Sequence, residues 1–185
     1  MALFSRKPRI EEFEEAALPH LNDLFRTASR LLGDAARADD VVQDVYLLAW
    51  KSFEKFEPGT NCRAWLFRIL FHSLHHYRRK WMNPREIREG EEVIGQAPAA
   101  PPVAGQITDE EVLRALSALS EEYRAVVLLV DVEEFSYKEA ADILRVPIGT
   151  VMSRLNRGRR VLREQLSGTA KSYGIGSPAR EGRSA

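Results

Sequence analysis

Apolar residues recur at intervals of three and four along most of the chain, and stretches in which apolar and polar residues alternate are missing. Intervals of three and four place apolar side chains on one face of a helix, whereas alternation is typical of a half-buried strand. The sequence therefore predicts an all-α protein.

The pattern is interrupted once, between residues 82 and 107, where proline, glycine and alanine largely replace the bulky apolar residues. This composition favours an extended, flexible linker. The last residues, 168–185, are rich in glycine, serine and arginine and predict a disordered tail. We therefore expect two small helical domains, at residues 10–81 and 108–167.

The first domain begins with two helical stretches. Residues 10–32 carry one apolar stripe, and Pro19 should kink or divide this helix because the proline ring clashes with the preceding turn. Asp34 or Asp39 can cap the next helix. Residues 39–53 are apolar along two lines, so this helix must pack on more than one side. Its polar stripe comprises Asp40, Gln43 and Asp44. Taken alone, the stripe fits a solvated helix start, where acidic groups favour the helix dipole; the alternative is a protein-binding face.

A turn at residues 57–62 precedes a third helix, residues 63–81, for which Thr60 or Asn61 is the candidate cap. Besides its core line, this helix carries a second line, formed by Arg68, His72, His75 and Arg79. The neighbouring lines hold the aromatic residues Trp65, Phe67 and Phe71. Basic residues interleaved with aromatic rings suit single-stranded nucleic acid, which needs charge for its backbone and rings for unstacked bases. The aromatic residues fit a hydrophobic core equally well.

Residues 136–166 have the pattern of a helix-turn-helix. Ser136 and Glu139 form a capping box at the start of the first helix. Pro147 and Gly149 prevent one helix from running through the connection. The buried stripe of the second helix comprises Val151, Leu155, Gly158, Leu162 and Leu166. The opposite face of that helix carries Thr150, Ser153, Arg154 and Arg157.

Six arginines and a single acid, Glu164, lie between residues 145 and 166. Guanidinium groups on a helix whose first turns project outward are what recognition of base edges in the DNA major groove requires. The helix-turn-helix therefore predicts DNA binding. The alternative is a helical hairpin with a solvated basic face.

The chain has no net charge, with 27 basic and 27 acidic residues, so it is not a general binder of polyanions. The charges are nevertheless segregated. Acids gather at residues 11–15, 39–44 and 109–122, and bases gather at residues 78–80 and 154–163. This polarity suits a molecule that contacts nucleic acid on one side and protein on another.

The pattern of reactive residues does not indicate an enzyme. Cys62 is the single cysteine, which excludes an internal disulfide and favours a reducing cytoplasm. His72, His75 and His76 share a helix, but no second cysteine or nearby acidic pair completes a metal site. We find no nucleophile with its base and no glycine-rich phosphate loop, so we expect neither catalysis nor a cofactor. An apolar run of about eighteen residues and a signal-peptide core are both missing, which predicts a cytoplasmic protein without membrane insertion.

Three stretches of the chain resemble the extracytoplasmic-function branch of the bacterial sigma-70 family. They are DDVVQDVYLLAW at residues 39–50, FEPGTNCRAWLFRI at 56–69, and YKEAA followed by GTVMSRLNRGR within 137–159. They occur in the family's order, and the resemblance covers roughly residues 10–167. It implies a transcription initiation factor that binds core RNA polymerase and directs it to promoters. Residues 10–81 would recognise and melt the minus-ten element, and residues 108–167 would bind the minus-thirty-five element.

The resemblance also implies roles for individual residues. The surface that grips the clamp helices of the polymerase β′ subunit would contain Asp40, Gln43 and Asp44. The β flap and an anti-sigma factor are further expected partners. The loop at residues 59–62, with Asn61, would capture a flipped minus-ten base. The minus-ten helix would present Arg63, Arg68, His72, His75 and Arg79. The minus-thirty-five helix would present Thr150, Ser153, Arg154, Arg157 and Arg160. Met152 departs from the lysine that many relatives carry at its position.

The main competing interpretation is a stand-alone helix-turn-helix regulator. Such proteins usually dimerise to bind paired half-sites, and no dedicated dimerisation helix is evident in the sequence. A sigma mimic that sequesters a regulator without touching DNA is disfavoured by the six arginines around the second helix. A small enzyme is the weakest alternative.

Overall fold

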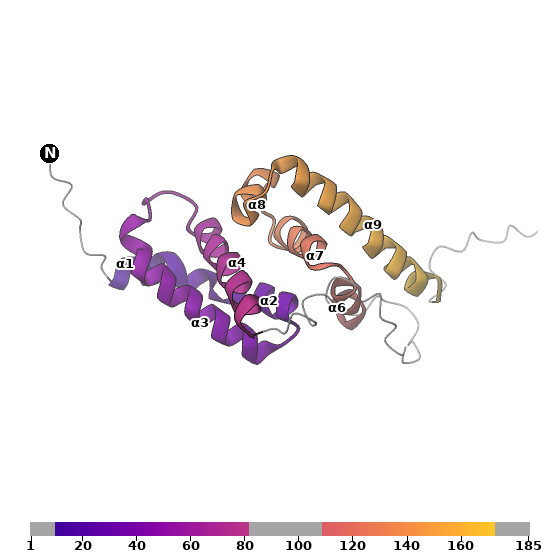
Figure 1. Cartoon of the computed structure of the whole chain (residues 1–185), viewed down its shortest axis with the longest axis horizontal. Helices are drawn as coiled ribbons and strands as arrows, with labels where there is room; N and C mark the ends of the chain where they lie inside the picture. Colours follow the sequence, from indigo (N-terminus) through magenta and orange to yellow (C-terminus); the bar gives the residue numbers. More distant parts are fainter. Residues whose placement is uncertain (1–9, 82–108, 173–185) are drawn as a thin grey trace, which may run out of the picture.

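The computed structural model describes residues 10–81 and 109–172, with side chains placed for residues 10–79 and 110–166. The described elements, shown in Figure 1, are all helical, which confirms the predicted fold class. The predicted linker at 82–107 lies outside the described residues. Most of the predicted tail at 168–185 also lies outside them, but its first residues continue the last helix, which ends at Ser172.

The first helical stretch is divided as its proline predicts. It forms α1 (Ile10–Ala17), the short 3-10 helix η1 (Leu18–His20), which contains Pro19, and α2 (Leu21–Leu32). Gly33 ends α2 with φ of 69°, a left-handed conformation that glycine adopts without steric cost.

The next helix, α3 (Ala35–Ser52), begins four residues earlier than the apolar pattern predicts. The reason is the capping residue: the side chain of Asp34 accepts hydrogen bonds from the backbone N–H groups of Ala36, at 2.8 Å, and Arg37, at 3.1 Å. The polar stripe with Gln43 therefore lies beyond the first turn of α3. The field of the helix dipole falls off within that turn, so it does not account for the stripe.

The core of the first domain lies where α2, α3 and the long helix α4 (Cys62–Trp81) meet, after the 3-10 helix η2 (Phe53–Lys55) and a turn. The fully buried side chains there include Leu24, Val41, Val45, Leu66, Phe67 and Leu70. The hydroxyl of Tyr46 donates a 2.8 Å hydrogen bond to the carbonyl of Ala17, which ties α3 to the end of α1.

The second domain contains the predicted helix-turn-helix. Its elements are α6 (Asp109–Ser117), α7 (Glu121–Val127), the π-helical segment η3 (Leu128–Val132), α8 (Tyr137–Leu144) and α9 (Ile148–Ser172). The capping box is present: the Ser136 hydroxyl oxygen accepts from the Glu139 N–H at 3.2 Å, and the Ser136 N–H donates to the Glu139 carboxylate at 3.0 Å. Ser120 precedes α7, and its side chain makes no capping hydrogen bond.

Gly158 allows α9 to lie closely against α7. A Cβ atom added at this position would stand 2.9 Å from Cγ2 of Val127 and 3.4 Å from Cβ of Tyr123. A residue with a side chain would therefore force the two helices apart. This close approach positions the N-terminal half of α9, which carries the polar stripe, against the rest of the domain.

The two domains also contact each other. Helix α4 packs against α8, and α2 contacts both α6 and α7 (Figure 1). Phe67 of α4 and Phe135, which precedes α8, meet edge to face with their ring centroids 4.9 Å apart, and both rings are buried. Within residues 10–81 and 109–172, no helix is long and apolar enough to cross a membrane.

Candidate nucleic-acid interface

The turn before α4 places Asn61 at the helix start. Gly59 has φ of 86°, and the Thr60 hydroxyl donates to the Glu57 carbonyl at 2.8 Å, which closes the turn. Oδ1 of Asn61 accepts from the N–H of Ala64 at 3.0 Å, so Asn61, and not Thr60, caps α4. Nδ2 of Asn61 points across to the second domain and donates to Oε1 of Glu139 at 2.8 Å.

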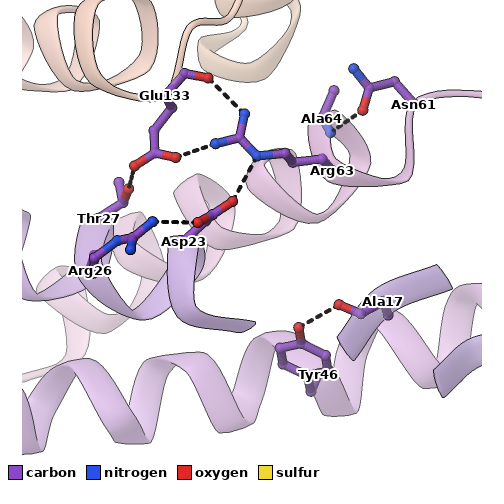
Figure 2. A network of polar contacts seen from close by, with 9 residues as sticks. All are labelled: Ala17, Asp23, Arg26, Thr27, Tyr46, Asn61, Arg63, Ala64 and Glu133. Atoms are coloured by element: carbon purple, nitrogen blue, oxygen red, sulfur yellow. Dashed lines mark hydrogen bonds and ion pairs between the residues drawn. The ribbon is translucent and has the colours of Figure 1, made fainter. Parts of the chain in front are cut away.

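Arg63, in the first turn of α4, is held by acidic groups from two parts of the chain (Figure 2). Its Nε lies 3.1 Å from Oδ2 of Asp23 in α2. Its Nη1 donates to the main-chain carbonyl of Glu133 at 2.7 Å, and its Nη2 forms an ion pair with the Glu133 carboxylate. The guanidinium carbon also lies 4.5 Å from the ring centroid of Phe135 and 5.1 Å from that of Phe67. Arg63 therefore joins the two domains.

The carboxylate of Glu133 is buried, with 5% of the residue exposed, and its other oxygen is also occupied. The hydroxyl of Thr27, itself fully buried, donates to Oε1 of Glu133 at 3.0 Å (Figure 2). We call Asp23, Thr27, Arg63 and Glu133 the interdomain polar network. A buried charge is tolerated only when it is paired and hydrogen-bonded, and this network supplies both.

The predicted basic line of α4 is exposed along its whole length, at Arg68, His72, His75 and Arg79. Part of it faces a cleft of about 380 Å³ between the domains, into which Arg145 and Arg154 project from the other side. Burial and then the charges of His76, Arg145 and His75 lower the pKa of His72. A lowered pKa favours the neutral form of His72, so the positive charge of this surface comes from its arginines, and Glu121 and Glu122 also line the cleft. Arginines gathered on one surface suit a polyanion.

The aromatic residues beside the basic line divide between core and surface. Phe67 is fully buried, whereas Trp65 is half-buried and packs 5.1 Å from the ring of Phe56. Arg78, which continues the basic line, is held by the Leu31 carbonyl at 3.0 Å and by an ion pair with Glu121. Burial, followed by the charge of Arg124, lowers the pKa of Arg78 to about 10. The side chain of Lys80 lies outside the described residues.

The polar face predicted for α9 reaches the surface of the domain. Ser153, Arg157 and Arg160 are exposed, and Thr150 and Arg154 are half-buried. The Ser153 hydroxyl donates to the Thr150 carbonyl at 3.0 Å. Arg154 differs from its neighbours because its Nη2 lies 2.7 Å from a carboxylate oxygen of Glu122 in α7, at the edge of the interdomain cleft.

The acidic stripe of α3 is exposed at Asp40, Gln43 and Asp44, and Gln43 donates to Asp39 at 2.8 Å. Apolar side chains continue this surface: Leu47 is 56% exposed and Leu48 is 42% exposed. Exposed apolar groups beside a polar rim are typical of a protein-binding surface. The structure therefore places this stripe where a protein partner has access to it.

Sequence analysis missed several residues that hold this arrangement. Asp131 binds Arg159 through two contacts, of 2.5 and 3.1 Å, and these hydrogen bonds raise the pKa of Arg159. It also missed Asp23, Thr27 and Glu133. Thr27 carried one available signal, since a polar residue on the apolar stripe of α2 requires a buried partner. No feature of the sequence points to Glu133 as that partner.

The described residues contain no group of three or more histidine, cysteine, aspartate or glutamate side chains placed to hold a metal ion. Cys62 is half-buried, and burial raises the pKa of its thiol, which makes it a poor nucleophile near neutral pH.

Two family models match the chain: "Sigma-70 region 2" over residues 17–82 and "Sigma-70, region 4" over residues 109–162. The ECF RNA polymerase sigma factor EcfG of Rhodopseudomonas palustris (strain TIE-1) is 36% identical over 156 residues, covering 82% of this chain and 83% of EcfG. The ECF RNA polymerase sigma factor SigE of Mycolicibacterium smegmatis is 35% identical, over 84% of this chain and 62% of SigE. The sigma factor RpoE of Bartonella quintana, solved in complex with the anti-sigma factor NepR, superposes with a TM-score of 0.69 at 33% identity, covering 85% of this chain and 98% of RpoE.

Proposed function

The chain belongs to the extracytoplasmic-function branch of the sigma-70 family, and we propose that it binds core RNA polymerase, directs it to specific promoters and helps to open the start site. The observation that carries this proposal is the exposure of two basic surfaces, one along α4 and one on α9, together with an exposed polar stripe on α3. In this account the polymerase performs the chemistry, and the chain supplies recognition without a cofactor or a resident metal.

The second domain, residues 108–167, would recognise the minus-thirty-five element. Helix α9 would enter the major groove with Thr150, Ser153, Arg154 and Arg157 facing the base edges, because these residues share one face in its first turns. Arg160 lies one turn further on and would contact phosphate, which positions the helix without specifying sequence. Support comes from the exposure of Ser153, Arg157 and Arg160 and from the capped α8 that sets the angle of α9.

The first domain, residues 10–81, would bind the minus-ten element after its strands separate. Asn61 stands at the tip of a closed turn, where its amide can bond to the edge of an extruded base. Arg63 and the exposed line of Arg68, His72, His75 and Arg79 would follow the DNA backbone. Unstacking a base costs a few kcal/mol, and contacts made only with the extruded base offset that cost.

Asp40, Gln43 and Asp44 of α3 would contact the β′ clamp helices of the polymerase, and the second domain would contact the β flap. The β′ contact is supported by the exposed leucines next to the acidic stripe. The leucines would supply apolar contact area, and the charged groups would fix how the two surfaces align. We also propose that the protein is cytoplasmic and is controlled by an anti-sigma factor. The second point is supported by the similar protein RpoE of Bartonella quintana, which was solved in complex with the anti-sigma factor NepR.

The decisive experiment combines the purified chain with core polymerase and a library of promoter fragments. We expect the chain to co-elute with core polymerase on gel filtration, and the complex to produce promoter-specific transcripts that core polymerase alone does not produce. If the chain binds DNA specifically as a dimer and never associates with core polymerase, it is a stand-alone regulator instead.

A further inference from the structure

The groups proposed to bind opened DNA are already occupied by the second domain. Glu133 fills two donors of Arg63, one through its carboxylate and one through its main-chain carbonyl. The side-chain amide of Asn61 donates a 2.8 Å hydrogen bond to the Glu139 carboxylate. A carboxylate and a phosphate use the same donors of a guanidinium group, so Glu133 takes the place that a DNA phosphate would need.

This contact has the character of a built interface. Surface ion pairs contribute little to stability, but Glu133 and Thr27 are buried and hydrogen-bonded to each other. The buried ring pair of Phe67 and Phe135 flanks the guanidinium group of Arg63, which adds apolar contact and cation–π attraction. Breaking one partner of such a pair leaves an unpaired buried charge, so the contact resists partial opening.

One residue of the surface proposed on α9 is also occupied in this arrangement. Arg154 is paired with Glu122 and lines the cleft opposite His72 and His75 of α4. A cleft of about 380 Å³ has room for a few side chains but not for a DNA duplex. Both surfaces can therefore bind DNA fully only after the domains separate.

We propose that the interdomain polar network, together with the contact between Asn61 and Glu139, holds the free protein in a closed, autoinhibited state. Opening it frees the side-chain amide of Asn61 and both Nη groups of Arg63, while Asp23 of the same domain keeps its contact with Nε, and polymerase binding supplies the free energy for that step. The inference rests on the proposed minus-ten role of these two residues. A protein whose open form is populated for about a tenth of the time binds its ligand about tenfold more weakly than the open form does.

The test uses the full chain and two substitutions at adjacent residues. Glu133→Lys places a like charge against Arg63 and should separate the domains. Glu134→Lys makes the same change of net charge at a neighbouring exposed side chain, so it controls for the general attraction of DNA to added positive charge. Glu133→Gln and Glu134→Gln form a milder pair, which serves if Glu133→Lys does not fold, as judged by its helical circular dichroism.

Two measurements are made on each variant. Small-angle X-ray scattering should show a larger radius of gyration for the Glu133 variants than for the wild type, and no change for the Glu134 variants. A fluorescein-labelled single-stranded DNA of randomised sequence should bind the Glu133→Lys chain about tenfold more tightly than the Glu134→Lys chain.

Equal radii of gyration for folded Glu133 and Glu134 variants would overturn the closed state. Larger radii of gyration for the Glu133 variants, with unchanged affinity for single-stranded DNA, would contradict the claim that the closed state blocks Asn61 and Arg63. Promoter-directed transcription with core polymerase is assayed separately on the wild type. Its absence would contradict the proposed function, whereas opening by Glu133→Lys would still establish the interdomain contact.

Discussion

Asn61 uses the two ends of one amide for two purposes. Its oxygen caps α4 by accepting from Ala64, and its nitrogen contacts Glu139 in the absence of DNA. A substitution at this position therefore changes helix stability and recognition together, unless the new side chain keeps either the capping oxygen or the amide nitrogen. Serine keeps a capping oxygen but has no amide.

Replacement of Asn61 tests whether the amide contacts an extruded base. We expect Asn61→Ala to lower the free energy of unfolding by about 1 kcal/mol through loss of the cap, and Asn61→Ser to leave it nearly unchanged. Both variants should impair strand opening more than closed-complex formation, as measured by permanganate reactivity of promoter thymines in the holoenzyme. If Asn61→Ser opens promoters as well as the wild type does, the residue serves only the helix.

Gly158 is the residue on which the approach of α9 to α7 depends. Gly158→Ala should destabilise the protein by about 1 to 3 kcal/mol, because its new methyl group would overlap Val127 in a packed region. Gly149→Ala is the matched control: nothing lies within 4 Å of its added Cβ, and alanine favours a helix more than glycine does. Urea unfolding monitored by circular dichroism measures both. A Gly158→Ala variant as stable as the wild type would show that the two helices move apart at no cost.

At the scale of elements, the sequence predicted what depends on local chemistry. Pro19 divides the first helix, and Ser136 and Glu139 cap α8. Pro147 directly precedes α9 as the turn prediction requires, but Gly149, predicted to lie in the turn, is part of α9. The cap of α3 was left open between Asp34 and Asp39, because both offer a capping carboxylate and the apolar pattern does not distinguish them; in the structure Asp34 is the cap. The exposed lines on α3, α4 and α9 followed from periodicity, since burial of one helix face leaves the opposite face free.

The stripe on α3 is predicted to contact core polymerase. The double substitution Gln43→Ala and Asp44→Ala should weaken association with core polymerase about tenfold or more, since it removes two polar contacts from an interface. Because both side chains are exposed, the melting temperature should hardly change. Glu14→Ala with Glu15→Ala removes exposed acidic groups from α1 and serves as the control. Association that is unaffected by the first pair, measured by surface plasmon resonance, would mean that the stripe is merely solvated.

Along α9, the arginines are predicted to differ in role. Arg157→Ala should lose about 1 to 3 kcal/mol of discrimination at one base pair of the minus-thirty-five element, because a bidentate contact to guanine is specific. Arg160→Ala should weaken binding to all promoters alike and reduce the dependence of affinity on salt. Holoenzyme affinities for single-base promoter variants at two salt concentrations separate the two effects. If both variants lose affinity equally for all promoter variants, α9 is not the element that recognises the DNA sequence.

At the scale of the whole molecule, the sequence predicted two domains but not how they meet. The contact unites Thr27, Arg63 and Glu133, which are distant in the chain, and helical periodicity shows which face is buried without showing what buries it. Charge segregation indicated separate acidic and basic surfaces. In the folded chain some of these surfaces face each other, as Arg154 and Glu122 do, so the protein neutralises part of the surface that we propose to bind DNA.

We propose that this chain recognises promoters only when it is bound to core RNA polymerase. The most direct measurement is the affinity for one promoter fragment, by fluorescence anisotropy, of the free chain and of the chain bound to core polymerase. We predict weak binding with little sequence preference for the free chain, and tight, sequence-specific binding for the complex. Tight, sequence-specific binding by the isolated chain, with a dimer seen in the analytical ultracentrifuge, would contradict the account.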